Sequence, residues 1–209
     1  MMPDMGDTRL SDLDRADLVH RGIWLSYVTI GYNSLEAVAS LIAGLLAGSV
    51  ALIGFGIDSV IEVTASVAAQ WRLRSDIDAS GREKVELATK RIIGVCFLAL
   101  AVYVLSDAAT TLWNRKAPDR SVLGIIVLSL SVIVMPVLAR SKKRVARAMR
   151  SDALEAEATQ TSLCAYLSII GLAGVTLNAL FGWWWADPAA ALVMVPIIAG
   201  EGWEGVRND

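Results

Sequence analysis

Two acidic residues, Asp58 and Glu62, lie four positions apart in the otherwise apolar stretch GFGIDSVIEV of residues 54–63. If this stretch is helical, the spacing places both carboxylates on one face, one turn apart. An acid at the centre of a membrane-spanning helix costs about 2.5–3.5 kcal/mol on insertion scales. Two such acids therefore need a compensating partner, and the candidates are a basic side chain, protons or a bound cation.

A salt bridge is the least favoured of these three explanations. No Lys or Arg is expected in the middle of an apolar segment, and the single histidine, His20, precedes the first one. A site for protons or for a cation remains, and one site can serve both in alternation.

Two residues of the preceding apolar segment favour the cation. Counted from the turn at Gly48, Glu36 and Asp58 lie roughly 18 Å and 14 Å along their helices at 1.5 Å per residue, and so at similar depth. Asn33, one turn further along, adds an oxygen donor. We predict Glu36 and Asn33 as further members of the site or of a relay. The alternative for Glu36 is a protonated, hydrogen-bonded carboxyl.

The elements that carry these residues are expected to lie in a membrane. Of the 209 residues 55% are hydrophobic, against about 45–50% in soluble domains. A spanning helix needs roughly 20 apolar residues. We predict an all-α membrane protein with a cytoplasmic segment at residues 1–20 and a domain at residues 21–207. Its six transmembrane helices are expected at residues 21–47, 50–73, 85–113, 122–139, 151–185 and 188–206.

The basic residues predict the orientation. If both termini are inside, all but three of the 19 Lys and Arg residues lie on the cytoplasmic side, the exceptions being Arg115, Lys116 and Arg120. The positive-inside rule therefore predicts an N-in, C-in topology. The basic run at residues 141–150 fits this topology and contact with anionic lipid, rather than nucleic-acid binding. Cys96 and Cys164 both fall in apolar segments, which argues against a disulfide framework.

The stretch AGLLAGSVALIGFGIDSVIEV of residues 43–63 resembles the first two helices of the cation diffusion facilitator family of divalent-metal transporters. That family has a Gly-Ser-Val-Ala turn followed by an acid-or-His-xxx-acid pair. WWWADPAAALVMVPI, at residues 183–197, is similar to the start of its sixth helix. The resemblance covers about residues 20–207. It implies a cation-efflux fold, Asp58 and Glu62 as metal ligands, and proton-coupled export of a transition metal by a homodimer in the cytoplasmic (inner) membrane.

The family's other two ligands form a His-xxx-Asp pair on the fifth helix, where this chain has no histidine. One register places Glu155 and Thr159 at these positions, and the other places Gln160 and Cys164 there. We prefer Gln160 and Cys164, because the separation of Cys164 from Asp187 is closer to the family's spacing.

Two other acids have expected positions. In the preferred register Glu157 lies near the basic cytoplasmic end, where an acid costs little. Asp187, followed by Pro188, is predicted to cap the sixth helix at its own N-terminus.

The predicted donors are two carboxylates, an amide and a thiolate, with Glu36 and Asn33 beside them. They suit a borderline metal as the substrate, zinc first, with cobalt, cadmium, iron and manganese as further candidates. Because no histidine is expected among the site residues, the carboxylates and the thiol must exchange the protons of an antiport. The protein is thus expected to be a secondary transporter rather than an enzyme.

Three further expectations complete the sequence-based interpretation. The family's C-terminal cytoplasmic domain is not expected, so a homodimer would form through the membrane helices or the amino-terminal segment. A transporter of another cation or small solute stays open as an alternative. So does a membrane sensor or scaffold that binds metal without moving it.

Overall fold

The computed structural model describes residues 5–74, 79–149 and 152–207, and the regular structure of these ranges is helical. The helices are α1 (Met5–Ala47), α2 (Val50–Arg74), α3 (Ala79–Trp113), α4 (Val122–Met149), α5 (Asp152–Phe181) and α6 (Ala186–Arg207). Each holds a stretch that is long and apolar enough to cross a membrane. The predicted six-helix membrane fold is confirmed, and the orientation of its termini stays a prediction.

Several helices are longer than the apolar segments that they contain. α1 begins at Met5 instead of residue 21, and α4 continues to Met149, well past the expected end at residue 139. The reason for α4 is that SKKRVARAM is rich in Lys, Arg and Ala, which favour helix whether or not they lie in lipid. α5 ends earlier than expected, at Phe181, where Gly182 adopts a left-handed φ of 67°. The expected start of the fifth helix at residue 151 lies outside the described residues, as do residues 1–4.

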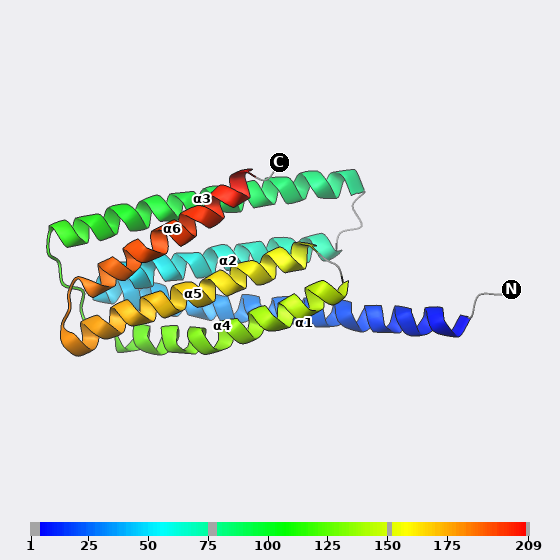
Figure 1. Ribbon diagram of the computed structural model, residues 1–209, viewed down its shortest axis with the longest axis horizontal. Helices are drawn as coiled ribbons and strands as arrows, with labels where there is room; N and C mark the ends of the chain where they lie inside the picture. The colour runs from blue at the N-terminus through cyan, green and yellow to red at the C-terminus, as the bar shows by residue number, and fades with distance from the viewer. Residues whose placement is uncertain (1–4, 75–78, 150–151, 208–209) are drawn as a thin grey trace.

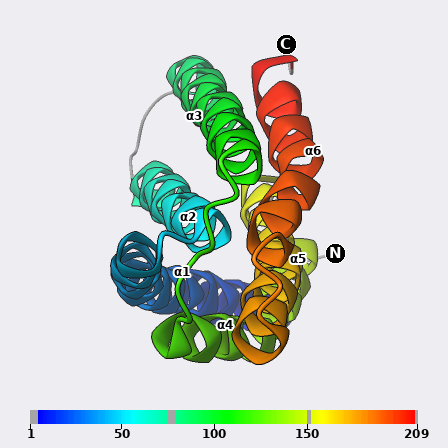
Figure 2. The same cartoon turned by 90° about the vertical axis from the view of Figure 1, so that its left-hand side faces the viewer.

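The helices form one elongated bundle in which α3 and α6 pair along one side (Figures 1 and 2). α2 packs against α1, α3, α5 and α6. As a result 67% of the spanning part of α2 is buried, against 28–44% for the other five helices. The helix with the acid pair is therefore the most enclosed element of the bundle.

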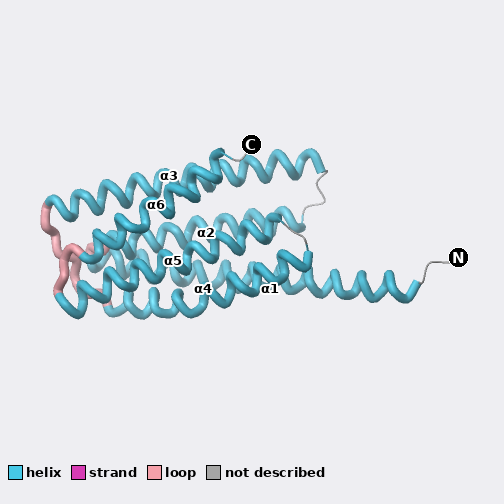
Figure 3. The backbone as a smooth tube through the Cα atoms, in the orientation of Figure 1, coloured by secondary structure: helices cyan, strands magenta, loops and turns pink. Residues whose placement is uncertain are grey.

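The two ends of the bundle differ in their connections. Figure 3 shows the α1–α2, α3–α4 and α5–α6 connections together at one end, which we call the loop end. α2 and α4 both finish at the opposite end. The α1–α2 turn is as short as predicted: Gly48 has a φ of 63°, and Ser49 Oγ accepts a hydrogen bond from Leu52 N at 3.2 Å. Ser49 thus caps the start of α2.

Asp187 binds this turn from the far end of the chain. α6 begins at Ala186, so Asp187 lies inside its first turn. The Asp187 carboxylate accepts hydrogen bonds from Ser49 Oγ at 2.5 Å and from Val50 N at 3.0 Å. The prediction that Asp187 caps its own helix is therefore wrong, because its carboxylate caps α2 instead. A carboxylate at a helix N-terminus is also favoured by the helix dipole.

Close contact between α3 and α6 depends on two glycines. A Cβ on Gly94 would lie 2.8 Å from Gly202 O, and one on Gly202 would lie 2.9 Å from Gly94 O. Such small-residue contacts let membrane helices approach at backbone distance. This contact fixes the position of the neighbouring residue Glu201 on α6.

Candidate metal site

The acid pair of α2 is buried and only partly satisfied. The exposed fractions of Asp58 and Glu62 are 5% and 2%. Among the described residues, Asp58 Oδ2 and Glu62 Oε2 have no hydrogen-bond partner. Burying a charged oxygen without a partner is costly. The two unsatisfied oxygens therefore fit a site that a cation enters.

A small cavity lies beside these acids. Its polar lining consists of Asp58, Glu62, Gln160 and Glu201, and its apolar lining of Phe97, Leu163, Leu167, Ile197 and Ile198. Its volume is about 10 Å³, close to the space that one water molecule needs. α2, α5 and α6 thus each supply oxygen donors to one enclosed space.

The fifth helix presents the preferred pair of residues to the acids. Gln160 lines the cavity. Cys164, one turn further along α5, is buried, and its Sγ lies 3.9 Å from Glu36 Oε2.

The two residues of the alternative register lie on the exposed side of α5. Glu155 and Thr159 are both exposed, and Thr159 Oγ1 donates a hydrogen bond to the Glu155 carbonyl oxygen of its own helix at 3.0 Å. The geometry therefore favours Gln160 and Cys164 over these two, while the ligand role itself stays a prediction.

α1 adds two polar side chains to the same region. Glu36 is buried, and its Oε2 accepts a hydrogen bond from Ser59 Oγ at 3.0 Å. Its Oε1 has no partner among the described residues, nor does either polar atom of the Asn33 side chain. Cys164 connects Glu36 with the α5 side of the site, since it lies beside Glu36 and follows the cavity residue Gln160 by one helical turn.

These donors do not form a closed coordination shell in this conformation. Within residues 5–74, 79–149 and 152–207, no three Cys, His, Asp or Glu side chains are grouped as a metal would require. The site is therefore a set of neighbouring donors, whose side chains would have to draw together around an ion.

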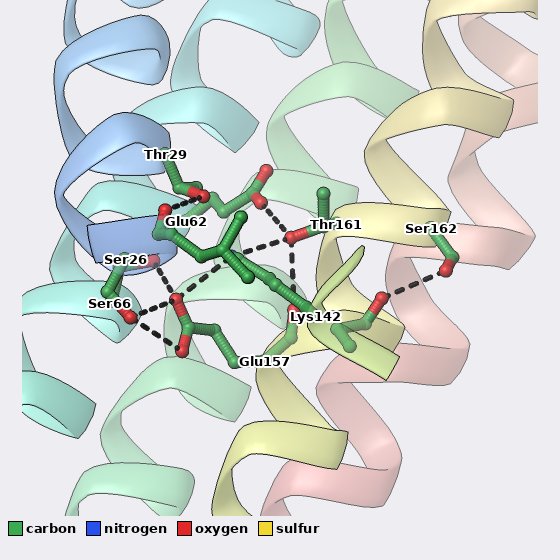
Figure 4. Close-up of polar contacts among 10 residues, drawn as sticks. Ser26, Thr29, Glu62, Ser66, Lys142, Glu157, Thr161 and Ser162 are labelled. Atoms are coloured by element: carbon green, nitrogen blue, oxygen red, sulfur yellow. Dashed lines mark hydrogen bonds and ion pairs between the residues drawn. The ribbon is translucent and has the colours of Figure 1, made fainter. Parts of the chain in front are cut away.

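A basic residue reaches the acid pair indirectly. Lys142 has an exposed fraction of 0%. Its Nζ lies 2.9 Å from Glu157 Oε1 and donates to Thr161 Oγ1 at 3.0 Å. Thr161 Oγ1 in turn donates to Glu62 Oε1 at 2.7 Å (Figure 4). Lys142 therefore forms its ion pair with Glu157 and reaches Glu62 only through Thr161, and among the described residues it makes no ion pair with Asp58 or Glu62. A long lysine side chain of α4 that enters the bundle was not expected from the sequence.

The expectation for Glu157 is also wrong. Its side chain is buried, and its carboxylate accepts hydrogen bonds from Ser66 Oγ at 2.9 Å and from Ser26 Oγ at 3.3 Å. With Lys142 as its ion-pair partner, Glu157 is fully satisfied, unlike the nearby acids of α2.

A sequence model of the cation efflux transmembrane domain matches residues 26–209. The chain belongs to this family. The match confirms the family that the α1–α2 turn and the acid pair predicted. It also shows that the protein is a multi-pass membrane protein of a transporter family.

Relatives of this cation efflux domain include three curated proteins. Transmembrane protein 163 of Xenopus laevis is 26% identical over 147 residues, which cover 70% of this chain and 52% of the relative. The manganese efflux system protein MneS of Bacillus subtilis is 24% identical over 198 residues, which cover 92% and 68%. The uncharacterized transporter sll1263 of Synechocystis is 24% identical over 174 residues, which cover 79% and 56%. The chain thus spans between about half and two thirds of these relatives.

For three polar residues of the cation efflux domain, the sequence did not predict a position at or beside the site. Glu201 could have been recognised, because it is the only acid of residues 188–203. Lys142 and Glu157 could not, since both lie where the apolar pattern ends and that pattern does not show which way a side chain turns.

Proposed function

We propose that this cation efflux domain exports a divalent transition-metal ion in exchange for protons, with Asp58 and Glu62 as its principal ligands. One observation carries the proposal. Both acids are buried on the most enclosed helix, each keeps one oxygen without a partner among the described residues, and both line one small cavity. A divalent cation cancels the two charges that otherwise make this arrangement costly.

The neighbouring side chains have supporting roles in this proposal. Gln160 offers an amide oxygen from the cavity wall, and Cys164, one turn further along α5, offers sulfur beside Glu36. Asn33 and Glu36 form the α1 side of the path. A metal ion requires deprotonated carboxylates and thiolate, so loading releases protons and unloading takes them up. That alternation is an antiport.

The identity of the metal depends on which donors bind it. A thiolate from Cys164 favours zinc, cobalt or cadmium, whereas carboxylate and amide oxygens suit manganese. The polar side chains that line the cavity all offer oxygen, and one relative is named as a manganese efflux protein. We therefore place manganese beside zinc as the first two substrates to test, followed by cobalt, cadmium and iron.

The proposed setting is the cytoplasmic membrane, with both termini inside and the protein as a homodimer. The distribution of Lys and Arg along the sequence supports the orientation. In this orientation the loop end lies outside, and the ends of α2 and α4 lie inside.

The experiment that tests the function is metal flux into proteoliposomes under an imposed proton gradient. We expect flux of Mn²⁺ or Zn²⁺ by the wild type, its loss in Asp58→Asn and in Glu62→Gln, and its retention in Asp107→Asn. Asp107 is the matched control because it lies on α3, away from the cavity lining. Flux that survives in the Asp58→Asn/Glu62→Gln double variant overturns the site. Metal binding without flux in the wild type would favour a sensor.

A further inference from the structure

A second polar cluster lies one helical turn from the acid pair, away from the loop end. On α2, Ser66 follows Glu62 by four residues, and on α5, Glu157 precedes Thr161 by four. Ser26 of α1 and Lys142 of α4 complete the cluster (Figure 4). Four helices thus converge on one point that is distinct from the cavity and continuous with it through Thr161 and Glu62.

The centre of this cluster is a cation among oxygen atoms. Lys142 Nζ lies 2.9 Å from a carboxylate oxygen of Glu157 and 3.0 Å from the Thr161 hydroxyl. The hydroxyls of Ser26 and Ser66 bond the same carboxylate. Every one of these side chains is buried. Carboxylate and hydroxyl oxygens are the donors that hard divalent cations prefer. The ammonium group therefore occupies the kind of position that a metal ion would take.

A purely structural role explains this arrangement poorly. Buried ion pairs contribute little to stability, because the desolvation of both charges offsets their attraction. In addition, Thr161 Oγ1 accepts from Lys142 and lies 2.7 Å from Glu62 Oε1 and 3.1 Å from the Glu157 carbonyl oxygen. Its single hydrogen serves one of these two acceptors, and the shorter contact is the one to the acid pair. The lysine is thereby linked to the transport site and not to packing alone.

We propose that Glu157 and the hydroxyls of Ser26, Ser66 and Thr161 form a second cation station, and that Lys142 is a tethered cation that occupies it when no metal is there. The station takes a divalent ion with oxygen ligands, such as Mn²⁺. In one state Lys142 neutralises Glu157. In the other state the carboxylates of Glu157 and Glu62 neutralise the divalent ion, and the ammonium group of Lys142 leaves the station with its own charge. As part of a transport path, the station depends on the proposed function, but its ability to bind an ion does not.

The test counts the Mn²⁺ ions bound by the purified chain in lipid nanodiscs, from the electron paramagnetic resonance signal of free Mn²⁺. Lys142→Met empties the station, and we expect it to bind one more Mn²⁺ per chain than the wild type. Lys142→Met/Glu157→Gln is expected to lose that extra ion. Lys143→Met and Lys142→Arg are the controls, and both should bind as the wild type does. A folded Lys142→Met variant that binds no additional Mn²⁺ overturns the station.

A second variant keeps the test decisive if Lys142→Met does not fold. Glu157→Gln leaves the Lys142 ammonium without its carboxylate, still bonded to Thr161 beside Glu62. We expect this charge to repel the ion at the acid pair and to weaken Mn²⁺ binding about tenfold or more. The double variant should restore the affinity, because it removes the charge. Unchanged affinity in Glu157→Gln contradicts a tethered cation.

The two proposals can fail separately. If Lys142→Met binds an extra Mn²⁺ but the wild type shows no flux, the second cation station is supported and the transport function is contradicted. If the wild type shows flux but Lys142→Met binds no extra Mn²⁺, the transport function is supported and the station is contradicted.

Discussion

Asp187 and Asp58 are both buried aspartates of one helical bundle, and they differ in how their oxygens are used. Asp187 accepts hydrogen bonds from Ser49 and Val50 on its two oxygens. Asp58 has an oxygen without a partner among the described residues and lines a cavity. Burial is common to both and therefore does not identify the functional acid. The unsatisfied oxygen does, because only there is a ligand still needed.

The most direct test of the difference between Asp58 and Asp187 is to remove the charge of each acid. Asp58→Asn should lower metal flux about 100-fold or more, since losing one partner of a buried charge contact costs about 3–5 kcal/mol and 1.4 kcal/mol is a factor of ten. The melting temperature should not fall, because the carboxylate contributes no fully satisfied contact. Flux and thermal unfolding of the same preparation measure both. Normal flux in Asp58→Asn would contradict a functional role for Asp58 that Asp187 lacks.

Asp187→Ala should show the opposite pattern. The hydroxyl of Ser49 and the N–H of Val50 lose their acceptor, and each buried group left unsatisfied costs about 1–3 kcal/mol. We expect a lower melting temperature and unchanged flux per folded molecule. The measurement is thermal unfolding in detergent, with Asp107→Asn as the control. A stable Asp187→Ala variant with lost flux would place Asp187 in the transport path.

Cys164→Ser tests the sulfur beside the acids. Replacing a soft donor by a hard one should shift the preference between Zn²⁺ and Mn²⁺ towards Mn²⁺ by about tenfold, or 1.4 kcal/mol. Cys96→Ser is the matched control, because Cys96 is exposed on α3. Competition between the two metals in the flux assay gives the ratio. An equal ratio in Cys164→Ser and wild type would exclude sulfur from the site.

The smallest effect is expected at the wall of the cavity. Gln160→Ala removes one neutral oxygen donor, worth about 1 kcal/mol, and should weaken metal binding roughly fivefold. Thr159→Ala, one residue away on the exposed face of α5, should leave binding unchanged. Calorimetric titration compares them. A larger effect at Thr159 than at Gln160 would reverse the choice of register.

Sequence patterns predicted those features that depend on one helix. The spacing of Asp58 and Glu62 identified their shared face, and the apolar segments identified all six spanning helices. Gln160 and Cys164 were preferred because the separation of Cys164 from Asp187 is close to the spacing in the family that the chain resembles. The first two inferences use only the pattern within single helices, and the third uses the resemblance.

Features that depend on contacts between helices could not be predicted in the same way. Lys142 lies at the end of an apolar run, and whether its side chain turns outward or towards Glu157 depends on how α4 packs. The partner of Asp187 is likewise in another helix. The bounds of α4 were missed for a different reason, since Lys, Arg and Ala continue a helix beyond the lipid that ended the apolar pattern.

The bond between Asp187 and the α1–α2 turn has a consequence for the biosynthesis of the protein. The two bonded residues Val50 and Asp187 are 137 positions apart, so a ribosome makes the first helical hairpin long before the carboxylate that caps it. Until α6 emerges, the N–H groups at the start of α2 must be hydrated or bound by another acceptor. The loop end of the bundle is therefore completed only after α6 has been synthesised.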